Sequence, residues 1–190
     1  MKQPSDQQFS LWAKKISRSD RASFDQLFRS LYPLLMRFAM RYTRDRAAAK
    51  DVTQDCFVKL WQRRDRIDPQ KSLKSFLYTM VRNRALNMIR DQSNTTVNHE
   101  LVGDVSSYDG LQDEIDSGRR SELDDLMQGW ISNLPERQKE AFELSRFEGL
   151  NHEEIAQVMD LSPKTVNNHI VAALGYLREH YENYAKKNQR

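Results

Sequence analysis

The stretch that decides the fold is NHEEIAQVMDLSPKTVNNHIVAALGYL, residues 151–177. Asn151 followed three residues later by Glu154 is the signature of a capping box, which starts a helix. Ser162 followed by Pro163 starts a second helix, because serine accepts a free backbone N–H and proline is tolerated at the first helical position. A short capped helix, a tight turn at Asp160 and a longer capped helix predict a helix-turn-helix.

The polar side of the second helix is suited to reading DNA. Its apolar residues recur every three or four positions and leave a polar face opposite them. Asparagine can pair with adenine through two hydrogen bonds, threonine can touch a base edge, and alanine allows close approach in the major groove. An ordinary helical hairpin with a polar outer face is the alternative. The residues that we expect to read DNA are Lys164, Thr165, Asn167, Asn168, His169 and Ala172.

The residues before this stretch predict further helices. Apolar side chains at helical spacing indicate four of them in residues 1–90, starting near Asp6, near Arg21, and over about 46–66 and 72–90. Pro33 lies inside the second pattern and should kink or restart that helix. Only 6 glycines and 5 prolines occur in 190 residues, which argues against a many-turned β-sandwich or barrel. We therefore expect an all-α protein with an N-terminal helix bundle.

Charge divides the chain into three segments. Residues 1–90 carry a net charge of +12, residues 91–130 carry −8 and residues 131–190 carry −1. Helical periodicity is lost after residue 90, where glycine and acidic residues are scattered. We expect a helical domain at 1–90, a flexible acidic linker at 91–120 and a helix-turn-helix domain at 121–190. The basic first segment favours a phosphate polymer as partner, although a solvated basic surface is also common.

The helix expected over 46–66 mixes acids with large apolar groups. This composition suits a helix that packs inward and also binds a protein partner through an aromatic anchor. The periodicity is at least as compatible with Phe57 and Trp61 lying in the core as with their binding a partner. The residues in question are Asp51, Gln54, Asp55, Phe57, Leu60 and Trp61.

The helix expected over 72–90 carries an aromatic–arginine pair. Tyr78 and Arg82 are four residues apart, and such planar groups on a basic helix can stack on unpaired bases. Lys71, Lys74 and neighbouring arginines would contact phosphates. Arg84 falls near the middle of the apolar side, and the sequence gives no reason for it.

The residues that could do chemistry form no recognisable catalytic or metal site. His152 to Ala156 begins like a zinc-protease helix, but the second histidine is missing. Cys56 is the one cysteine, which excludes an internal disulfide. We expect no enzyme activity, no cofactor and no metal. No apolar stretch approaches the ~20 residues of a membrane helix, so we expect no membrane insertion and a cytoplasmic location.

Two groups of motifs resemble the extracytoplasmic-function (ECF) sigma factors of the sigma-70 family. The segments DVTQDCFVKLW (51–61), LKSFLY (73–78) and RNRALN (82–87) resemble region 2 of these proteins. The segments LPERQ (134–138), FEG (147–149), EIA (154–156) and SPKTV (162–166) resemble region 4. Their order and the gap between them also match, and the resemblance covers roughly residues 20–185.

The resemblance implies a bacterial transcription initiation factor. Its partners would be core RNA polymerase, double-stranded promoter DNA, melted single-stranded DNA and an anti-sigma factor. The helix from Pro163 would read the minus-thirty-five element. Polymerase would be contacted by Asp51, Gln54, Asp55, Phe57, Leu60 and Trp61. The minus-ten element would be bound and opened by Lys71, Ser72, Lys74, Tyr78, Arg82, Asn83 and Asn87. Phe76 stands where members of the family often have tryptophan.

Two other interpretations remain open from the sequence. The C-terminal motifs also resemble the helix-turn-helix of LuxR-type regulators, which would require an α/β domain upstream. The helical, basic first ninety residues argue against that. A helical adaptor that binds proteins and not DNA is the third interpretation, and an enzyme is the least favoured.

Overall fold

The computed structural model describes residues 4–95 and 122–188. The chain divides into two compact units, Met1–Leu101 and Val102–Arg190. The described residues form eight α-helices and one short 3-10 helix and contain no strand, which confirms the all-α prediction. Most of the expected linker, residues 96–120, lies outside the described residues.

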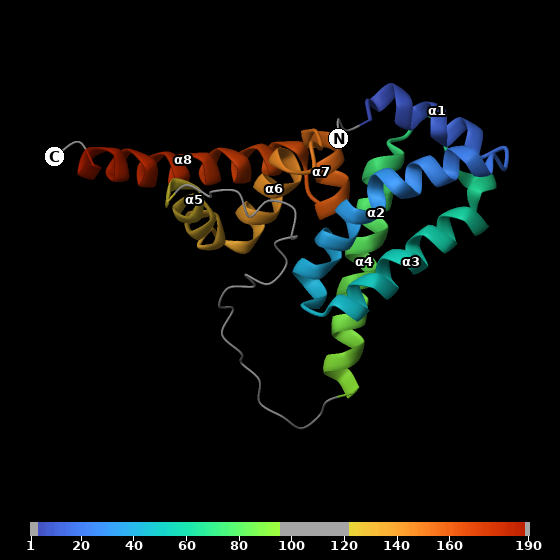
Figure 1. Cartoon of the computed structure of the whole chain (residues 1–190), viewed down its shortest axis with the longest axis horizontal. Helices are drawn as coiled ribbons and strands as arrows, with labels where there is room; N and C mark the ends of the chain where they lie inside the picture. The colour runs from blue at the N-terminus through green and yellow to red at the C-terminus, as the bar shows by residue number, and fades with distance from the viewer. Residues whose placement is uncertain (1–3, 96–121, 189–190) are drawn as a thin grey trace. The chain divides into compact units, whose positions relative to one another are not determined.

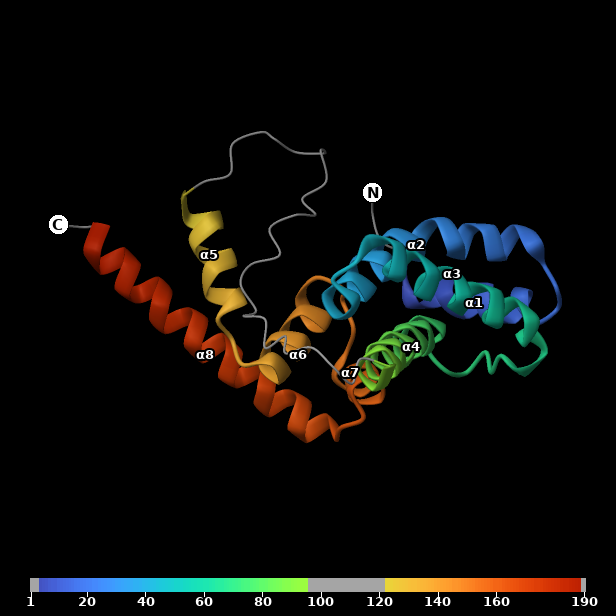
Figure 2. The same cartoon turned by 90° about the horizontal axis from the view of Figure 1, so that it is seen from below.

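The first unit is a bundle of four helices (Figure 1). Helix α2 packs against both α3 and α4, α3 also packs against α4, and α1 covers part of α2 and α4. Figure 2 looks nearly along the axis of α4. The elements are α1 Asp6–Ile16, α2 Arg21–Thr43, α3 Arg46–Gln62, the 3-10 helix η1 Arg64–Arg66, and α4 Leu73–Thr95.

The helix starts follow the expected capping chemistry. The side chains of Ser5, Asp20 and Asp45 accept hydrogen bonds from backbone N–H groups of the first turns of α1, α2 and α3. Each such cap satisfies a donor that has no partner inside its helix. Local sequence therefore fixes where the first three helices begin.

Two helix boundaries differ from the expectation, and the restart considered at Pro33 does not occur. Helix α2 runs as one helix from Arg21 to Thr43, and its ribbon bends along its length (Figure 1). The proline is exposed, while Leu31, Leu35 and Phe38 are buried and hold the residues on both sides of it against the bundle. The third helix ends at Gln62 and is followed by η1, and α4 runs to Thr95, beyond the predicted end at residue 90.

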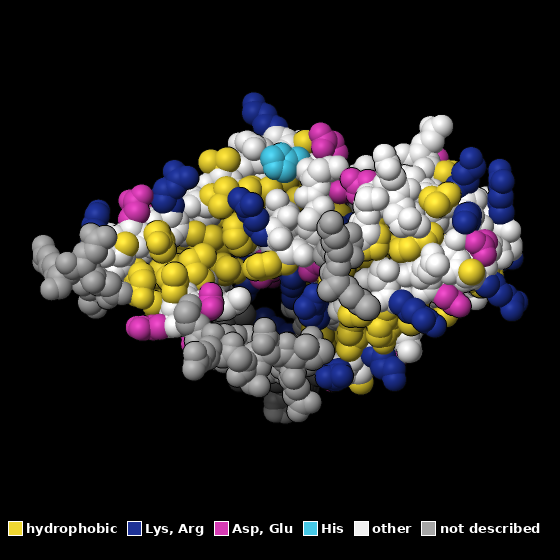
Figure 3. Space-filling model, turned by 45° about the horizontal axis from the view of Figure 1, so that its top comes forward, with side chains coloured by type: hydrophobic (Ala, Val, Ile, Leu, Met, Phe, Trp, Pro, Cys, Tyr) yellow, Lys and Arg dark blue, Asp and Glu magenta, His cyan; other side chains and the backbone are white. Residues whose placement is uncertain are grey.

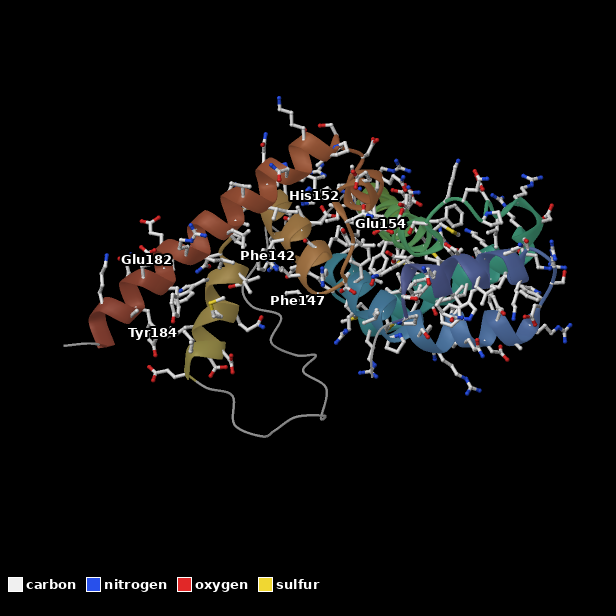
Figure 4. All side chains as sticks on the ribbon, turned by 90° about the horizontal axis from the view of Figure 1, so that it is seen from above. Phe142, Phe147, His152, Glu154, Glu182 and Tyr184 are labelled. Carbon is white, nitrogen blue, oxygen red and sulfur yellow. The ribbon has the colours of Figure 1, made fainter. Side chains whose placement is uncertain are left out.

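The second unit contains the predicted helix-turn-helix. Helix α8 packs against α5, α6 and α7, and α6 also packs against α7. A core of Ile131, Leu134, Phe142, Ala173 and Leu177 joins α5 and α6 to α8. Figure 4 shows Phe142 and Phe147 beside α6, and their ring centroids are 6.2 Å apart. The elements are α5 Glu122–Ser132, α6 Glu136–Arg146, α7 His152–Met159 and α8 Pro163–Asn188.

The turn between α7 and α8 has the geometry that the sequence predicts. The Glu154 N–H donates to the Asn151 side chain, and the Asn151 N–H donates to the Glu154 carboxylate, both at 2.9 Å. Asp160 ends α7 in the left-handed conformation, with φ 56°. Ser162 then caps α8 by accepting from the Thr165 N–H at 3.1 Å. These contacts fix the first turn of α8, from which the polar face of this helix extends.

Candidate functional site

The outward side of α8 carries most of the residues expected to read DNA. Lys164, Asn167, Asn168 and Ala172 are exposed, whereas Thr165 and His169 are half-buried. The Thr165 hydroxyl lies 2.8 Å from the Ser162 hydroxyl and so belongs to the cap of the helix. The exposed residues face solvent because Val166, Ile170, Ala173 and Leu177 on the opposite side are buried.

Val171 lies among these residues and was missed by the sequence analysis. Its side chain is 58% exposed, three residues after Asn168 and next to Ala172. The helical spacing 164, 167, 168, 171 and 172 would have placed it there. In Figure 3, hydrophobic side chains gather on the left-hand part of the surface in view, which holds α8. We call Lys164, Asn167, Asn168, Val171 and Ala172 the outer face of α8.

Two further residues of α8 lie beyond this face, Gly175 and Tyr184. Gly175 is exposed, and a Cβ placed there would meet nothing within 4 Å, so packing within the described chain does not demand glycine. Tyr184 lies on the side of α8 toward α5 (Figure 4), with its ring centroid 6.3 Å from that of Trp130. This contact joins the end of α8 to α5.

The outward side of α3 combines acids, an amide and an apolar residue. Asp51 and Gln54 are exposed, Asp55 is half-buried, and Val58 is 52% exposed. All four lie within one helical stripe, since they are three or four residues apart. Val58 was not among the predicted partner contacts, although its position in the stripe would have revealed it. We call these four residues the outer face of α3.

Two of the predicted partner contacts on α3 are core residues. Phe57 and Leu60 are buried. The Phe57 ring packs at 4.8 Å from Phe28 and 6.1 Å from Phe24, between centroids, and so holds α3 on α2. Both side chains are thus on the side of α3 that faces the bundle, and their contact with a partner stays a prediction.

Trp61 is half-buried at the end of α3. Its ring centroid lies 5.0 Å from that of Phe24, and the Arg64 guanidinium lies 4.7 Å above the ring. Arg64 also donates to the Trp61 carbonyl at 2.8 Å and to the Ser19 hydroxyl at 2.9 Å. The indole is thus held in one place beside the outer face of α3.

On α4, two residues expected to touch DNA are buried. Tyr78 lies fully inside the bundle, edge-on to Phe38 with centroids 5.0 Å apart, and Lys74 is buried as well. Both share a stripe with Val81 and Ala85, at successive spacings of four, three and four residues, and this whole stripe is buried. In this structure both side chains therefore belong to the interior of the bundle, and the DNA contacts expected of them stay predictions.

The exposed side of α4 carries a different aromatic residue. Phe76 is 50% exposed and shares its side of the helix with Asn83 and Asn87, which are also exposed. Lys71 is exposed just before the helix, and Arg82 is half-buried. The Ser72 hydroxyl accepts from the Ser75 N–H at 3.1 Å and caps the helix. We call Phe76, Asn83 and Asn87 the outer face of α4.

Arg84 connects α4 to α3. Its Nε lies 3.1 Å from Asp55 Oδ2, and the Nζ of Lys59 lies 2.9 Å from the same oxygen. The position of Arg84 near the apolar side of α4 thus has a structural reason, since that side faces α3 and its carboxylate.

In residues 4–95 and 122–188, no cluster of three histidine, cysteine or acidic side chains could hold a metal ion. Burial raises the pKa of the Cys56 thiol to about 12, so the thiol stays neutral near pH 7 and is a poor nucleophile. In the same two ranges, none of the helices has both the length and the hydropathy needed to span a membrane.

Each of the two units matches a known protein family. The family "Sigma-70 region 2" matches residues 27–95, and "Sigma-70, region 4" matches residues 126–177. Together the two matches cover more than half of the chain. They contain α3 and α4 in the first unit and α6, α7 and the start of α8 in the second.

Relatives match along nearly the whole length. The ECF RNA polymerase sigma-E factor of Haemophilus influenzae is 29% identical over 178 residues, which is 90% of this chain and 91% of the relative. The RNA polymerase sigma-H factor of Pseudomonas aeruginosa is 26% identical over the same length and coverage. The ECF sigma factor RpoE of Cereibacter sphaeroides is 27% identical over 162 residues, 85% of this chain and 87% of that protein.

Solved structures share the fold. CnrH, in complex with the cytosolic domain of CnrY, superposes with a TM-score of 0.62 at 20% identity and covers 93% of this chain and 98% of its own. The sigma factor RpoE of Bartonella quintana, in complex with the anti-sigma factor NepR, gives a TM-score of 0.59 at 23% identity, over 84% and 96% of the two chains. With two family regions in order, and relatives matched from end to end, the chain belongs to the ECF sigma factors of the sigma-70 family.

Proposed function

We propose that this sigma factor divides its work between its two units. The first unit would bind core RNA polymerase through α3 and open the minus-ten element with α4, and the second would read the minus-thirty-five element with α8. Sigma factors of this family bind core RNA polymerase and direct it to promoters. The observation that carries the division of labour is the presence of three separate exposed faces, on α3, α4 and α8.

The outer face of α3 is the surface that fits polymerase best. It has an exposed valine beside carboxylates and an amide, with the rigidly held Trp61 at its end. Apolar centres with a polar rim are typical of protein interfaces. The carboxylates stand out in a basic segment, so a positively charged partner surface would be complementary.

The outer face of α4 is suited to single-stranded DNA. An exposed aromatic ring can stack on a base, which is a contact that tolerates any sequence. Asn83 and Asn87 offer donors and acceptors beside Phe76, and Lys71 offers a phosphate contact. We assign the stacking role to the exposed Phe76, because Tyr78 is buried.

The outer face of α8 is suited to the major groove. Asn167 and Asn168 can form two hydrogen bonds with adenine, and Val171 and Ala172 can contact a thymine methyl group. The last segment of the chain, residues 131–190, is nearly neutral, so the contribution of non-specific phosphate attraction would be small. Stable promoter binding would then depend on the polymerase-bound first unit.

An anti-sigma factor would be the second protein partner. RpoE of Bartonella quintana is held by its anti-sigma factor NepR in the structure that this chain resembles. We place the protein in the cytoplasm, where core polymerase and DNA are found. Nucleotide chemistry would be performed by polymerase and not by this chain.

The test is transcription of genomic fragments by purified core polymerase with and without the protein. We expect new start sites that share two sequence elements at fixed spacing. DNA binding without polymerase binding or new start sites would favour the LuxR-type alternative, although that alternative expects an α/β domain where residues 4–95 form helices. Binding to neither DNA nor polymerase would favour an adaptor.

A further inference from the structure

Asp55 connects the outer face of α3 to Arg84, a residue of α4. It belongs to the outer face of α3, and its Oδ2 lies 3.1 Å from the Arg84 Nε of α4. Lys59 reaches the same oxygen at 2.9 Å. One carboxylate therefore holds two cations, one from its own helix and one from α4.

Arg84 stands at the edge of the outer face of α4. It is three residues before Asn87, and side chains at that spacing are neighbours on a helix. A guanidinium released from Asp55 at this position could turn toward DNA bound along α4. Arginine suits that task because its planar fork of donors binds phosphate oxygens well.

The shared oxygen of the ion pair, Asp55 Oδ2, is itself buried, whereas the rest of the two side chains is partly open to solvent. The Asp55 and Arg84 side chains are 33% and 44% exposed. Ion pairs at such sites are weak, since water solvates the separated charges and the contact costs side-chain freedom. A cation brought by a partner on the outer face of α3 can compete for the same carboxylate.

Resting on the proposed function of α3 and α4, we propose that Arg84 is a DNA phosphate-binding residue that Asp55 restrains in the free chain. A basic group of core RNA polymerase that binds Asp55 releases Arg84, and the promoter-binding helix gains one positive charge. The free sigma factor then binds DNA more weakly than the same helix does in the holoenzyme. Polymerase binding and DNA binding are thereby coupled through one carboxylate.

The test compares full-length variants in their affinity for a fluorescent single-stranded DNA of mixed sequence. The variants are Asp55→Asn, Arg84→Gln and the double variant, and Asp51→Asn removes the same charge one turn earlier on α3. Asp55→Asn should bind DNA more tightly than Asp51→Asn. This advantage in affinity should be about threefold larger at 50 mM salt than at 200 mM salt, which is the salt dependence of one added phosphate contact. Adding Arg84→Gln should remove this excess.

The same comparison in the holoenzyme tests the release. With saturating core polymerase, Asp55→Asn should lose its advantage over Asp51→Asn, because Arg84 is already free. Arg84→Gln should weaken DNA binding, and the loss should be about threefold larger at 50 mM than at 200 mM salt. Equal affinities of the free Asp55→Asn and Asp51→Asn chains would overturn the proposal, as would an advantage that persists in the double variant or in the holoenzyme. Circular dichroism checks that each variant is folded, and Arg84→Met, which also lacks the charge, replaces Arg84→Gln if the latter unfolds.

Failure of the proposed function would look different. If wild-type chain did not bind core polymerase, the assignment of α3 would fail, while the free-chain comparison would still decide whether Asp55 restrains Arg84. If polymerase bound and the free-chain comparison showed no difference, only the restraint by Asp55 would be overturned.

Discussion

Phe76 is the aromatic side chain that α4 offers to a ligand, and its neighbour Tyr78 is part of the bundle. The two residues are only two positions apart, which places them on opposite sides of a helix. Tyr78 packs against Phe38 of α2, so replacing it would disturb the core before it disturbed any DNA contact. At the scale of single residues, the aromatic ring available for a DNA contact on α4 is therefore the exposed one, Phe76.

Replacing Phe76 tests this assignment. Phe76→Ala should weaken promoter opening by about 1–3 kcal/mol, the worth of one base–aromatic stack, and leave polymerase affinity unchanged. Permanganate reactivity of the minus-ten thymines in the holoenzyme measures the opening. Tyr78→Phe is the matched control and should open the promoter normally if the chain remains folded. Wild-type opening by Phe76→Ala would remove the residue from the DNA-binding surface.

At the scale of helices, periodicity predicted the faces of α8 better than those of α4. Helix α8 has a narrow buried stripe, and its polar residues at 164, 167 and 168, together with Ala172, are exposed as predicted. Helix α4 packs against α1, α2 and α3, so its buried stripe is wide and includes Lys74 and Tyr78. Residue types alone place lysine and tyrosine outside, and only the neighbouring helices reveal that they are buried.

Residue types alone also failed to reveal Val58, Val171 and the partner of Arg84. Val58 and Val171 are apolar and were assigned to no surface, yet spacing places each on an exposed face. The partner of Arg84 lies on α3, 29 positions earlier in the chain, and no local pattern contains that contact. Helix starts could be predicted, by contrast, because capping depends on residues three positions apart.

Asn168 tests the outer face of α8. Asn168→Ala should cost about 1–3 kcal/mol of promoter binding by the holoenzyme if the amide pairs with a base. Polymerase affinity and thermal unfolding should not change, because the side chain is exposed. Fluorescence anisotropy with promoter DNA provides the affinity. Equal affinities of wild type and variant would place base reading on other residues of this face.

At the scale of the whole molecule, the two ends of the chain carry different charges, which accords with the different tasks that we propose for the two units. The basic first segment holds the faces proposed for polymerase and for single-stranded DNA, whereas the nearly neutral last segment holds the outer face of α8. Specific reading by α8 is then worth little until the first unit has brought polymerase to the DNA. The chain would act on promoters only as part of the holoenzyme.

The central claim is that the outer face of α3 binds core RNA polymerase. Titration of fluorescently labelled chain with core polymerase tests it most directly, with Val58→Lys as the variant and Leu11→Lys as the matched control. Both residues are exposed and apolar, but Leu11 lies on α1, away from α3 in the sequence and outside the proposed face. We predict saturable binding of wild type and Leu11→Lys, and at least tenfold weaker binding of Val58→Lys, about 1.4 kcal/mol, because a lysine there would face the positively charged partner surface unpaired. Equal binding of all three chains, or no binding of the wild type, would contradict the account.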